Sequence, residues 1–547
     1  MEGGERLARY SFVGAAPYRV ISVDDPRQQK SSSSTSTNSS VPSTSSTSSI
    51  DSSSIYSNNH FQGDPLIPLQ QIMDTHRLLS VPSVRLPSFT GGAIGYIGYD
   101  AVRYFEPKTQ SSFQHQNDML QIPDAVFMLC DTLVIFDHVR HTIKIVSHVQ
   151  IPDLPIVSDS NQQTIKNQNY QMQLLHNYTM ACTKIENLLI RLSGSIPLED
   201  IIPLPAASPH APPSPVRIFN NTATNNTIEP IQLPSSHVAT TGQASTTPSF
   251  DWEKCSNVGK EGYENMVQSL KHHIVEGDII QAVPSQRITR EIPPNNPITA
   301  FDIYRQLRVV NPSPYMFYLE LGPDFQIVGA SPEMLVKVDT SGMIYTHPIA
   351  GTRRRGATPE EDEQLATELL NDIKERAEHI MLVDLGRNDI GRVAAPGTVK
   401  VDSLMHIEKY SHVMHIVSNV SGKLATNKTS YDAFRSIFPA GTVSGAPKVM
   451  AVDLVAKLEP HRRGVYAGAV GYVGYSGVMD TAIAIRTLVI RGKQVHLQAG
   501  AGIVYDSIPV AEYEETLSKL RATMRAVDAA ITAGDQIIER KKWLSRN

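Results

Sequence analysis

Gly92-Ala-Ile-Gly-Tyr-Ile-Gly-Tyr99 returns late in the chain as Gly468-Ala-Val-Gly-Tyr-Val-Gly-Tyr475. Glycine alternating with β-branched and aromatic residues is typical of strands whose glycine face lets another backbone approach closely. Two unrelated glycine-rich strands would also explain either copy alone. The shared pattern favours two equivalent places in a duplicated architecture. Because the expected strands come in runs and the helices come separately, the sequence predicts an α+β fold.

Hydrophobic periodicity predicts the elements around this repeat. RYSFVG and YRVISV near the N-terminus alternate like strands, and further strands are expected at 279–287, 316–321 and 325–328. Helices are expected at 263–276, 360–385 and 510–531. The second helix is expected to have an apolar side made of Leu369, Leu370, Ile373, Ala377 and Ile380.

Composition divides the chain into ordered and low-complexity parts. Residues 31–59 are rich in Ser and Thr and are expected to form a disordered insertion. Residues 196–250 are rich in Pro, Ser, Thr and Asn and are expected to form an extended linker. Residues 1–30 are too few to bury a core, so we expect them to join residues 60–195 in an N-terminal half. Residues 251–547 form the remaining ordered block.

The overall composition excludes several classes of protein. The chain has 547 residues, of which 41% are hydrophobic and 19% are charged, as in ordinary globular proteins. A net charge of -5 and the lack of a dense Lys/Arg run argue against nucleic acid binding. No apolar run is long enough for a membrane span. Three cysteines without metal or redox spacing, and an N-terminus without a signal-peptide core, predict a cytoplasmic protein.

Two pairs of carboxylates, Glu375 with Glu378 and Glu512 with Glu515, lie within the expected helices. Residues three apart share a helix face, so each pair points in one direction. Converging carboxylates suit a hard cation such as Mg²⁺, which keeps several water ligands. The alternative is two solvated faces paired with neighbouring basic residues, and spacing alone favours that alternative. The basic neighbours are Lys374, Arg376 and Lys519.

Three glycine-containing clusters could bind anions through exposed backbone N–H groups. They are Ile349–Arg353, Gly441–Lys448 and Gln498–Gly502. Each could be an ordinary turn, and the chain has no Walker A, GxGxxG or GxSxG motif. Together with the carboxylates they predict a small polyanionic substrate held beside Mg²⁺. Tyr466 could orient this substrate, and Arg486 could clamp a carboxylate with two hydrogen bonds.

The sequence resembles the anthranilate synthase component I family of chorismate-using enzymes. The matching stretches span the chain apart from its two low-complexity segments. They are RYSFVGAAP, FTGGAIGYIGYD, GDIIQAVPSQR, NPSPYMFYL, GASPEML, PIAGTRRRG, DIKERAEHIMLVDLGRND, YSHVMHIVS, FPAGTVSGAPK, YAGAVGYVGY, DTAIAIRT and QAGAGIVYDS. The resemblance implies a duplicated four-layer α/β/β/α fold with two packed, mainly antiparallel sheets. It also implies that residues 251–547 are the chorismate-binding catalytic domain.

Two positions separate this family from its relatives. Isochorismate and salicylate synthases place a Lys general base where this chain has Gln281. An amide cannot accept a proton near neutral pH, so Gln281 suits ammonia, which needs no prior deprotonation. Aminodeoxychorismate synthases, the alternative enzyme class, typically carry an attacking Lys where this chain has Ala350.

The resemblance implies a role for each matching residue. Glu378 and Glu515 would bind Mg²⁺ directly, while Glu375 and Glu512 would act through metal-bound waters. Glu333 matches the general acid that protonates the leaving hydroxyl. The other expected catalytic residues are Gln281, Thr442 and His415, the last in pyruvate elimination. The expected substrate-binding residues are Gly351, Thr352, Lys448, Tyr466, Arg486, Gly500, Ala501 and Gly502. His379 and His412 are expected to be structural.

The implied reaction joins chorismate and ammonia into 2-amino-4-deoxyisochorismate and then releases anthranilate and pyruvate. It is the first committed step of tryptophan biosynthesis, catalysed by a lyase. The chain has no GxCxG nucleophile motif, so a separate glutamine amidotransferase subunit is expected to supply the ammonia.

The family also implies feedback inhibition by tryptophan, at an LLES segment and the NPSPYM motif. The expected effector contacts here are Pro314, Tyr315, Met316 and Tyr472. The LLES segment is absent, because the chain opens at Met1-Glu2-Gly3-Gly4, and we expect a truncated gene model. A tryptophan-binding paralogue without catalysis is a further alternative, disfavoured because the expected metal and acid residues are all present.

Overall fold

The computed structural model describes residues 9–25, 60–79, 86–152, 160–194, 251, 253–410 and 413–545. The expected disordered insertion, the expected linker and His412 lie outside the described residues. Among the described helices, none has an apolar stretch long enough to cross a bilayer.

An eleven-stranded sheet runs through both ordered blocks of the chain. Ten strands follow one path, and β15 (Lys400–Lys409) pairs with β16 beside it. The path is β14 (Ile349–Arg354), β16 (Val413–Lys423), β13 (Met343–Thr346), β12 (Met334–Val338), β19 (Met479–Ile483), β18 (Ala469–Gly474), β4 (Gly92–Ile97), β5 (Ala125–Cys130), β2 (Arg19–Asp24) and β3 (His60–Gln62).

The two copies of the glycine repeat are neighbouring strands in this sheet. β4 and β18 pair antiparallel, with Gly95 directly opposite Gly471. A Cβ atom at Gly95 would stand 1.9 Å from the carbonyl oxygen of Val126, and one at Gly471 would stand 2.2 Å from that of Asp480. Only glycine allows this approach. An antiparallel pair has a local two-fold relationship, so the copies occupy equivalent places, as the repeat predicts.

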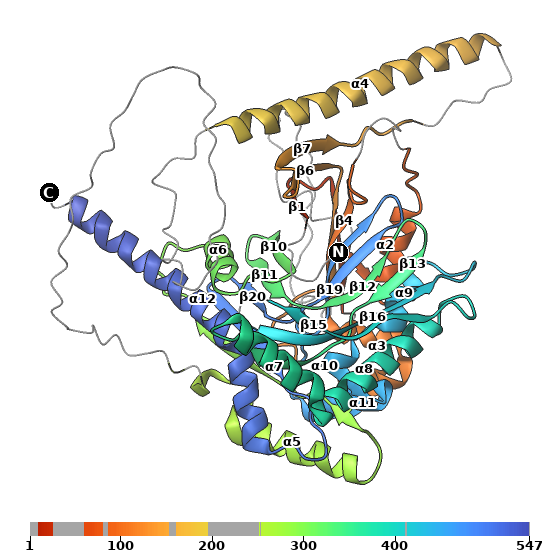
Figure 1. Ribbon diagram of the computed structural model, residues 1–547. Helices are drawn as coiled ribbons and strands as arrows, with labels where there is room; N and C mark the ends of the chain where they lie inside the picture. Colours follow the sequence, from red (N-terminus) through yellow and green to blue (C-terminus); the bar gives the residue numbers. More distant parts are fainter. Residues whose placement is uncertain are drawn as a thin grey trace, which may run out of the picture.

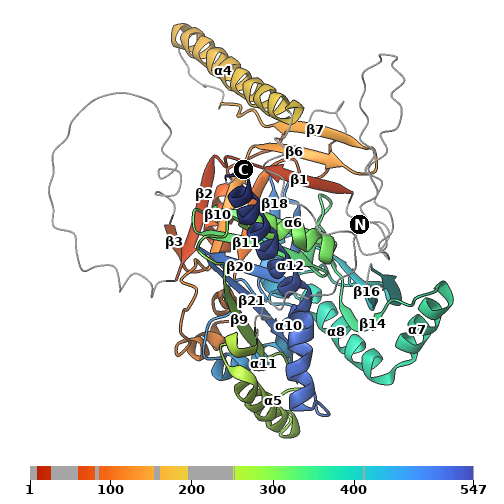
Figure 2. The ribbon, with the colours of Figure 1, turned by 90° about the vertical axis from the view of Figure 1, so that its left-hand side faces the viewer.

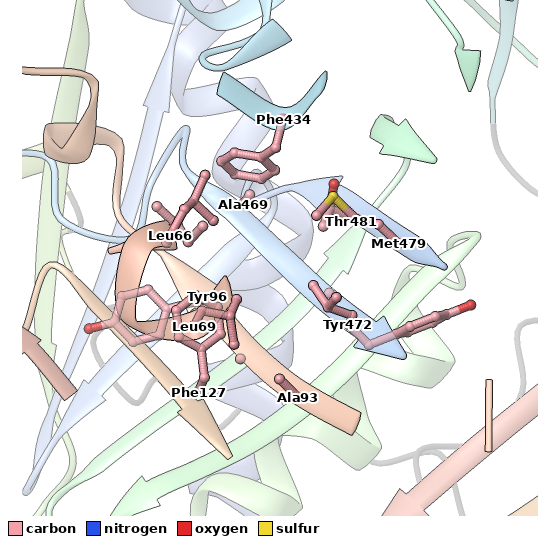
Figure 3. A pocket seen from close by; sticks show the side chains of 14 residues that line it. Leu66, Leu69, Ala93, Tyr96, Phe127, Phe434, Ala469, Tyr472, Met479 and Thr481 are labelled. Atoms are coloured by element: carbon pink, nitrogen blue, oxygen red, sulfur yellow. The ribbon is translucent and has the colours of Figure 1, made fainter. Parts of the chain in front are cut away.

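The small residues of these strands leave an apolar cavity of about 20 Å³, which is roughly the room of one water molecule. Figure 3 shows Leu66, Leu69 and Phe434 gathered around Ala93 and Ala469. Its lining carries no charged side chain, so this cavity is part of the packed core and not a site for an anionic substrate.

A five-stranded sheet packs against the large one. Its order is β10 (Tyr315–Gly322), β11 (Phe325–Ser331), β20 (Thr487–Arg491), β21 (Gln494–Gly500) and β9 (Ser285–Glu291). Two smaller sheets complete the described strands. One comprises β1 (Tyr10–Gly14), β6 (Thr132–Asp137) and β7 (Thr142–Ser147), and the other comprises β17 (Gly445–Ala446) and β8 (Gln281–Ala282).

Helices cover the outer faces of both sheets (Figures 1 and 2). The described helices are α2 (Leu66–Met73), α3 (Val102–Phe105), α4 (Ser160–Ser193), α5 (Gly259–Val275), α6 (Ala300–Val310), α7 (Pro359–Asn371), α8 (Ile373–Gly391), α9 (Ser430–Ile437), α10 (Gly441–Ser444), α11 (Lys448–Leu458) and α12 (Pro509–Leu544). Short 3₁₀ turns lie at Tyr99–Ala101, Pro107–Phe113 and Glu253–Cys255. α4 lies over β7, at one end of the molecule (Figure 1).

Three buried apolar clusters define four layers. One joins helices α2, α8, α9 and α11 to the large sheet. The second lies between the sheets, where Tyr96 and Val470 of the large sheet share a cluster with Ile327 and Val489 of the smaller sheet. The third joins the smaller sheet to α6 and α12. The order is therefore helix, sheet, sheet, helix, and the α+β prediction is confirmed.

The N-terminal strands pair with the second block, because β1 pairs with β6 and β2 pairs with β5. The predicted helix at 263–276 corresponds to α5, and the one at 510–531 lies within α12. The predicted strand at 279–287 is in fact two strands, since β8 ends at Ala282 and β9 begins at Ser285.

The prediction of a single helix over 360–385 is wrong. Asp372 has extended backbone, with φ −68° and ψ 114°, and separates α7 from α8. Its carboxylate accepts hydrogen bonds from the backbone N–H groups of Lys374 and Glu375, which starts a new helix. The break also changes which side of the helix is buried. Ile373 is 84% exposed and Ile380 is 52% exposed, so neither belongs to the expected apolar side.

Candidate active site

Glutamates of α8 and α12 converge at one place. The pKa of Glu378 is raised, first by burial and then by the nearby charges of Glu375 and Glu515. The pKa of Glu512 is raised by burial and by Glu515. Two helices far apart in sequence therefore bring carboxylates within electrostatic reach of one another. This repulsive arrangement is the signature expected of a cation site.

Basic side chains neutralise only part of this group. Arg353 Nη1 lies 3.1 Å from Glu375, and Lys519 Nζ lies 2.6 Å from Glu515. Lys374 instead pairs with Asp506, at 3.1 Å. For Glu515 the alternative interpretation holds, because its carboxylate pairs with a basic neighbour, Lys519, on a solvated helix face. It does not account for Glu378, which is partly buried and has no cationic hydrogen-bond partner among the described residues.

The donor set suits Mg²⁺ with substrate oxygens and water as further ligands. Among the described residues, no three His, Cys, Asp or Glu side chains form a closed metal cluster by themselves. Mg²⁺ requires no such cluster, because it usually binds one or two protein carboxylates and retains water or substrate oxygens. A divalent cation would also relieve the repulsion that raises the pKa of Glu378. The residues fit the ion by chemistry.

Gln281 lies against this carboxylate group. Its Nε2 donates to Glu378 Oε1 at 2.9 Å, so the side chain orientation is fixed. Its Oε1 atom is buried and has no hydrogen-bond partner among the described residues. A buried amide oxygen without a donor is costly, which marks it as an acceptor kept for a ligand. A Cβ at Gly502 would come 2.4 Å from Gln281 Nε2, so the glycine turn at Gln498–Gly502 reaches the same place.

Glu333 is a buried carboxyl group that stays protonated at neutral pH. It lies between β11 and β12 and is 7% exposed. Burial raises its pKa to about 8, and the hydrogen bond from Thr442 offsets only part of this rise. Thr442 Oγ1 lies 3.1 and 3.2 Å from the two carboxyl oxygens. A neutral carboxylic acid with one fixed partner is suited to donate a proton.

His415 of β16 has the opposite electrostatic character. Its Nδ1 lies 3.0 Å from the Gly351 carbonyl oxygen and 3.1 Å from Thr352 Oγ1. A carbonyl oxygen only accepts, so Nδ1 carries the hydrogen and Nε2 has the free lone pair. Burial lowers the pKa of His415, and the charge of Arg486 lowers it further. The imidazole is therefore neutral and can act as a base.

The glycine turns and Tyr466 complete the site. A Cβ at Gly351, whose φ is +69°, would stand 3.0 Å from Glu375 Oε2. Tyr466 is 6% exposed, and its hydroxyl would lie 3.1 Å from a Cβ at Gly500. Lys519 Nζ donates to the Gly500 carbonyl at 2.9 Å. Both turns thus border the carboxylates and present backbone where a side chain would obstruct a ligand.

Arg486 lies partly buried beside these residues, and burial lowers the pKa of its guanidinium. Its charge acts on Tyr466, Glu515 and His415. Its backbone φ of 51° is uncommon for a residue with a side chain, and such strain is frequent at functional sites. This position fits the predicted carboxylate clamp.

Lys448 is not brought to the predicted site. Its Nζ lies 2.7 Å from Asp389 Oδ2 and 2.8 Å from the Ile437 carbonyl oxygen, so its charge is used within the helical layer. Ala501 contributes only backbone, and its N–H donates to the Tyr263 hydroxyl at 3.2 Å. His379 is fully buried and bonds Ser418 Oγ at 2.6 Å, as expected for a structural histidine.

Two of the predicted effector residues, Tyr315 and Tyr472, lie near each other beside Asp480. Tyr315 hydrogen-bonds the Asp480 side chain, and the Asp480 charge also acts on Tyr472. Tyr472 stacks on Phe89 with ring centroids 4.0 Å apart. Met316 packs instead in the cluster with α6 and α12, because successive residues of a strand point to opposite faces. Pro314 immediately precedes β10.

Two contacts at the site were not predicted from the sequence. Arg353 binds both Asp372 and Glu375, and the Tyr410 ring lies 5.6 Å from the His415 ring. The pairing of Lys519 with Glu515 was among the expected alternatives, since residues four apart adjoin on a helix. Nothing in the sequence places Tyr410 against His415 or Arg353 against α8, because these contacts join separate elements.

Comparisons with known proteins identify the family of this chain. Residues 204–525 match the chorismate binding enzyme family. The chain is 44% identical over 518 residues to anthranilate synthase component 1 of Saccharomyces cerevisiae, with 94% of this chain and 82% of that protein covered. It is 42% identical to the probable anthranilate synthase component 1 of Schizosaccharomyces pombe, with 96% of this chain and 86% of that protein covered.

Solved structures show the same relationship. Anthranilate synthase component I from Streptococcus pneumoniae superposes with a TM-score of 0.65 and 32% identity, with 96% of this chain and 95% of that chain covered. A menaquinone-specific isochorismate synthase from Escherichia coli shares the fold, with a TM-score of 0.52 and 18% identity. The chain therefore belongs to the chorismate-binding enzymes and, within them, to the anthranilate synthase component 1 family, the large subunit of anthranilate synthase in tryptophan biosynthesis.

Proposed function

We propose that this chain converts chorismate and ammonia into anthranilate and pyruvate, through 2-amino-4-deoxyisochorismate. The observation that carries this proposal is the combination of a protonated Glu333, a neutral His415 and an amide at Gln281 that bonds the Glu378 carboxylate. The acid and the base have environments that keep both in their working forms at neutral pH.

The first step is the addition of ammonia with loss of the ring hydroxyl. Glu333 donates its proton to the departing hydroxyl, which leaves as water, while ammonia forms the new C–N bond. The resulting ammonium group then loses one proton to solvent, and Glu333 takes one up again. The unpartnered Oε1 of Gln281 accepts a hydrogen bond from ammonia and holds its lone pair toward the ring. A lysine at this position would bring a base that could activate water, and an amide does not.

The second step eliminates pyruvate from the aminated intermediate. His415 Nε2 removes the ring proton at the carbon that bears the new amino group, and the enolpyruvyl C–O bond breaks as the ring becomes aromatic. The enolpyruvate that leaves takes up one proton, equivalent to the one removed, and becomes pyruvate. The Gly351 carbonyl fixes the ring orientation and stabilises the imidazolium that forms. Atoms balance, since chorismate plus ammonia gives anthranilate, pyruvate and water.

Magnesium is the proposed cofactor. Glu378 and Glu515 would hold the ion directly, with Glu375 and Glu512 acting through its waters. When bound, the ion would neutralise the substrate carboxylate and withdraw electrons from the conjugated ring. Arg486 and Tyr466 would orient the other polar groups of chorismate, and the turns at Gly351, Gly500 and Gly502 would give it room.

We further propose that a separate glutamine amidotransferase subunit docks at the mouth of this site. Ile280, next to Gln281, is an exposed apolar side chain. Ile373, Tyr505 and Ile508 are also exposed, and the Lys374–Asp506 ion pair places the start of α8 against the loop before α12. An apolar rim around a site that consumes ammonia suits a partner that delivers it.

We place this activity in the cytoplasm, consistent with the three unbridged cysteines.

Tryptophan is the proposed feedback inhibitor, bound near Tyr315 and Tyr472. The Asp480 carboxylate between these rings could accept from an amino group, and one of its oxygens has no hydrogen-bond partner among the described residues. Tryptophan should inhibit the ammonia-dependent reaction of the wild type. This inhibition should be weaker in Tyr472→Ala and unchanged in the surface variant Tyr178→Ala. Equal inhibition of both variants would contradict it.

The product of the purified chain tests the main proposal. Chorismate, Mg²⁺ and ammonium sulfate should give anthranilate, which is detected by its fluorescence. Formation of 4-amino-4-deoxychorismate would instead favour the aminodeoxychorismate synthase alternative, and formation of isochorismate would favour water as the nucleophile. Ala350 and Gln281 argue against these two outcomes.

A further inference from the structure

A buried ion pair lies behind the proposed active site. Arg463 is 1% exposed and Glu459 is 4% exposed, and both come between α11 and the strand that follows Tyr466. Arg463 Nε and Nη2 donate to the two carboxylate oxygens of Glu459, each at 2.9 Å. This two-bond geometry is specific to a guanidinium. Removing a charge pair from water is costly, so the pair adds little net stability to the fold.

The same guanidinium joins two segments that carry site residues. Nη1 donates to the Val443 carbonyl at 2.9 Å, and Val443 follows Thr442. Nη2 donates to the Val283 carbonyl at 2.5 Å, and Val283 lies two residues after Gln281. Glu459 adds a third anchor, because Oε1 accepts from the backbone N–H and the hydroxyl of Ser285, at 2.8 and 2.7 Å.

These two segments also contact each other directly, over a short span. They meet in the two-residue pairing of β8 with β17 and in two further backbone hydrogen bonds, from Ile280 N–H to the Ala446 carbonyl at 2.7 Å and from Val283 N–H to the Ser444 carbonyl at 3.1 Å. Such a short ladder is weak by itself. On its other side, the Arg463 guanidinium lies 5.6 Å from the centre of the Tyr466 ring. One side chain therefore contacts the supports of Thr442, Gln281 and Tyr466.

We propose that Arg463, locked by Glu459, is a positioning residue for the addition of ammonia. It holds the turn that bonds Glu333 and the strand that carries the ammonia acceptor at one fixed separation. This inference rests on the proposed function. A displacement of about 1 Å between reacting groups can cost about 100-fold in rate, so a clamp at this position acts directly on turnover.

The test compares Arg463→Lys with Arg290→Lys. Lysine keeps the charge but cannot reproduce the fork of the guanidinium. Arg290 of β9 is a matched control, because its side chain is also largely buried and forms an ion pair, with Asp528 at 3.0 Å. Ammonia-dependent kcat, the KM for chorismate and the pH profile of kcat are measured for the wild type and both variants, with thermal unfolding recorded for each.

For Arg463→Lys we expect kcat to fall between about 10- and 100-fold, with a smaller change in KM. The alkaline limb of the pH profile reports the loss of the Glu333 proton, and we expect it to move to higher pH, because the turn whose Thr442 bonds Glu333 and lowers its pKa has shifted. Arg290→Lys should lose stability without either effect. A folded Arg463→Lys enzyme with wild-type kcat and limb, or one indistinguishable from Arg290→Lys, would overturn the proposal.

If Arg463→Lys does not fold, the variant Glu459→Gln tests the positioning role of Arg463 instead. Its amide keeps one acceptor oxygen for Ser285 but weakens the lock on Arg463, so kcat should fall and the limb should move in the same direction. Unchanged values would overturn the clamp. A wild-type chain that makes no anthranilate would be a failure of the proposed function, which the wild-type assay shows before any variant is compared.

Discussion

Thr442 Oγ1 lies within hydrogen-bond distance of both carboxyl oxygens of Glu333, at 3.1 and 3.2 Å. This hydroxyl is the polar side-chain contact that lowers the pKa of a carboxyl group which burial raises to about 8. The pair joins the turn at α10 to the end of β11, and it sets the pH at which the proposed acid can donate.

The first prediction concerns pH. The acid form of Glu333 is lost as pH rises through about 8, so kcat at saturating free ammonia should fall above that pH. Thr442→Val removes the bond that lowers this pKa, so the alkaline limb should move to higher pH. Thr523→Val, which removes a buried hydroxyl in α12, is the control and should leave the limb in place. If Thr442→Val leaves the alkaline limb in place, the limb does not report the ionisation of Glu333.

The second prediction concerns stability. The pKa of Glu333 is raised from 4.5 when unfolded to about 8 when folded. The contribution of Glu333 to the free energy of unfolding is therefore complete below pH 4.5 and is lost as pH rises to about 8. This contribution is on the order of a few kcal/mol. Glu333→Gln should remove this pH dependence and be more stable than wild type at pH 8, while kcat falls about 100-fold or more. Urea unfolding at pH 5 and pH 8 measures the difference; parallel changes in both proteins would contradict it.

The third prediction concerns the metal. Glu378→Gln and Glu515→Gln should each weaken Mg²⁺ binding by more than about 10-fold, measured by calorimetry on the protein without substrate. They should also abolish Mg²⁺-dependent turnover. Glu514→Gln changes a neighbouring exposed carboxylate of α12 and should bind Mg²⁺ as wild type does. Wild-type binding in the Glu378 and Glu515 variants would show that the ion is held elsewhere.

The fourth prediction separates the two steps. His415→Asn removes the proposed base but leaves Glu333 and Gln281 in place. The variant should accumulate 2-amino-4-deoxyisochorismate and form anthranilate at least about 100-fold more slowly. His406→Asn alters a partly exposed histidine on β15 and serves as the control. Chromatography of the products checks both variants, and normal anthranilate release by His415→Asn would exclude its role as base.

The fifth prediction concerns the partner surface. Ile373→Gln with Tyr505→Ser should reduce glutamine-dependent activity with an amidotransferase subunit and preserve ammonia-dependent activity. The same polar change at the exposed Val139, between β6 and β7, should affect neither. If glutamine-dependent activity survives the double substitution, the partner does not dock at this rim.

Local patterns predicted much of this fold, and tertiary contacts decided the rest. The glycine repeat predicted strands of close approach, and Gly95 does face Gly471. The break at Asp372 was not predicted, because the apolar spacing continues across it while the aspartate caps a new helix. The pairing of Lys448 with Asp389 was also invisible, since it depends on how α11 packs on α8.

The candidate site shows the same division. Motif positions identified Glu333, Gln281 and His415, but their protonation states come from burial and from partners on other elements. The unpartnered oxygen of Gln281 exists only because its amide nitrogen is taken by Glu378. The Arg463 clamp joins three segments that no spacing rule connects.

The central claim is tested most directly by the products formed when the purified chain is given chorismate, Mg²⁺ and ammonium ions without any partner subunit. Anthranilate and pyruvate should appear in equal amounts, and neither should form when ammonium or Mg²⁺ is omitted. A folded, Mg²⁺-supplied chain that consumes chorismate without releasing anthranilate, or that releases none at all, would contradict the account.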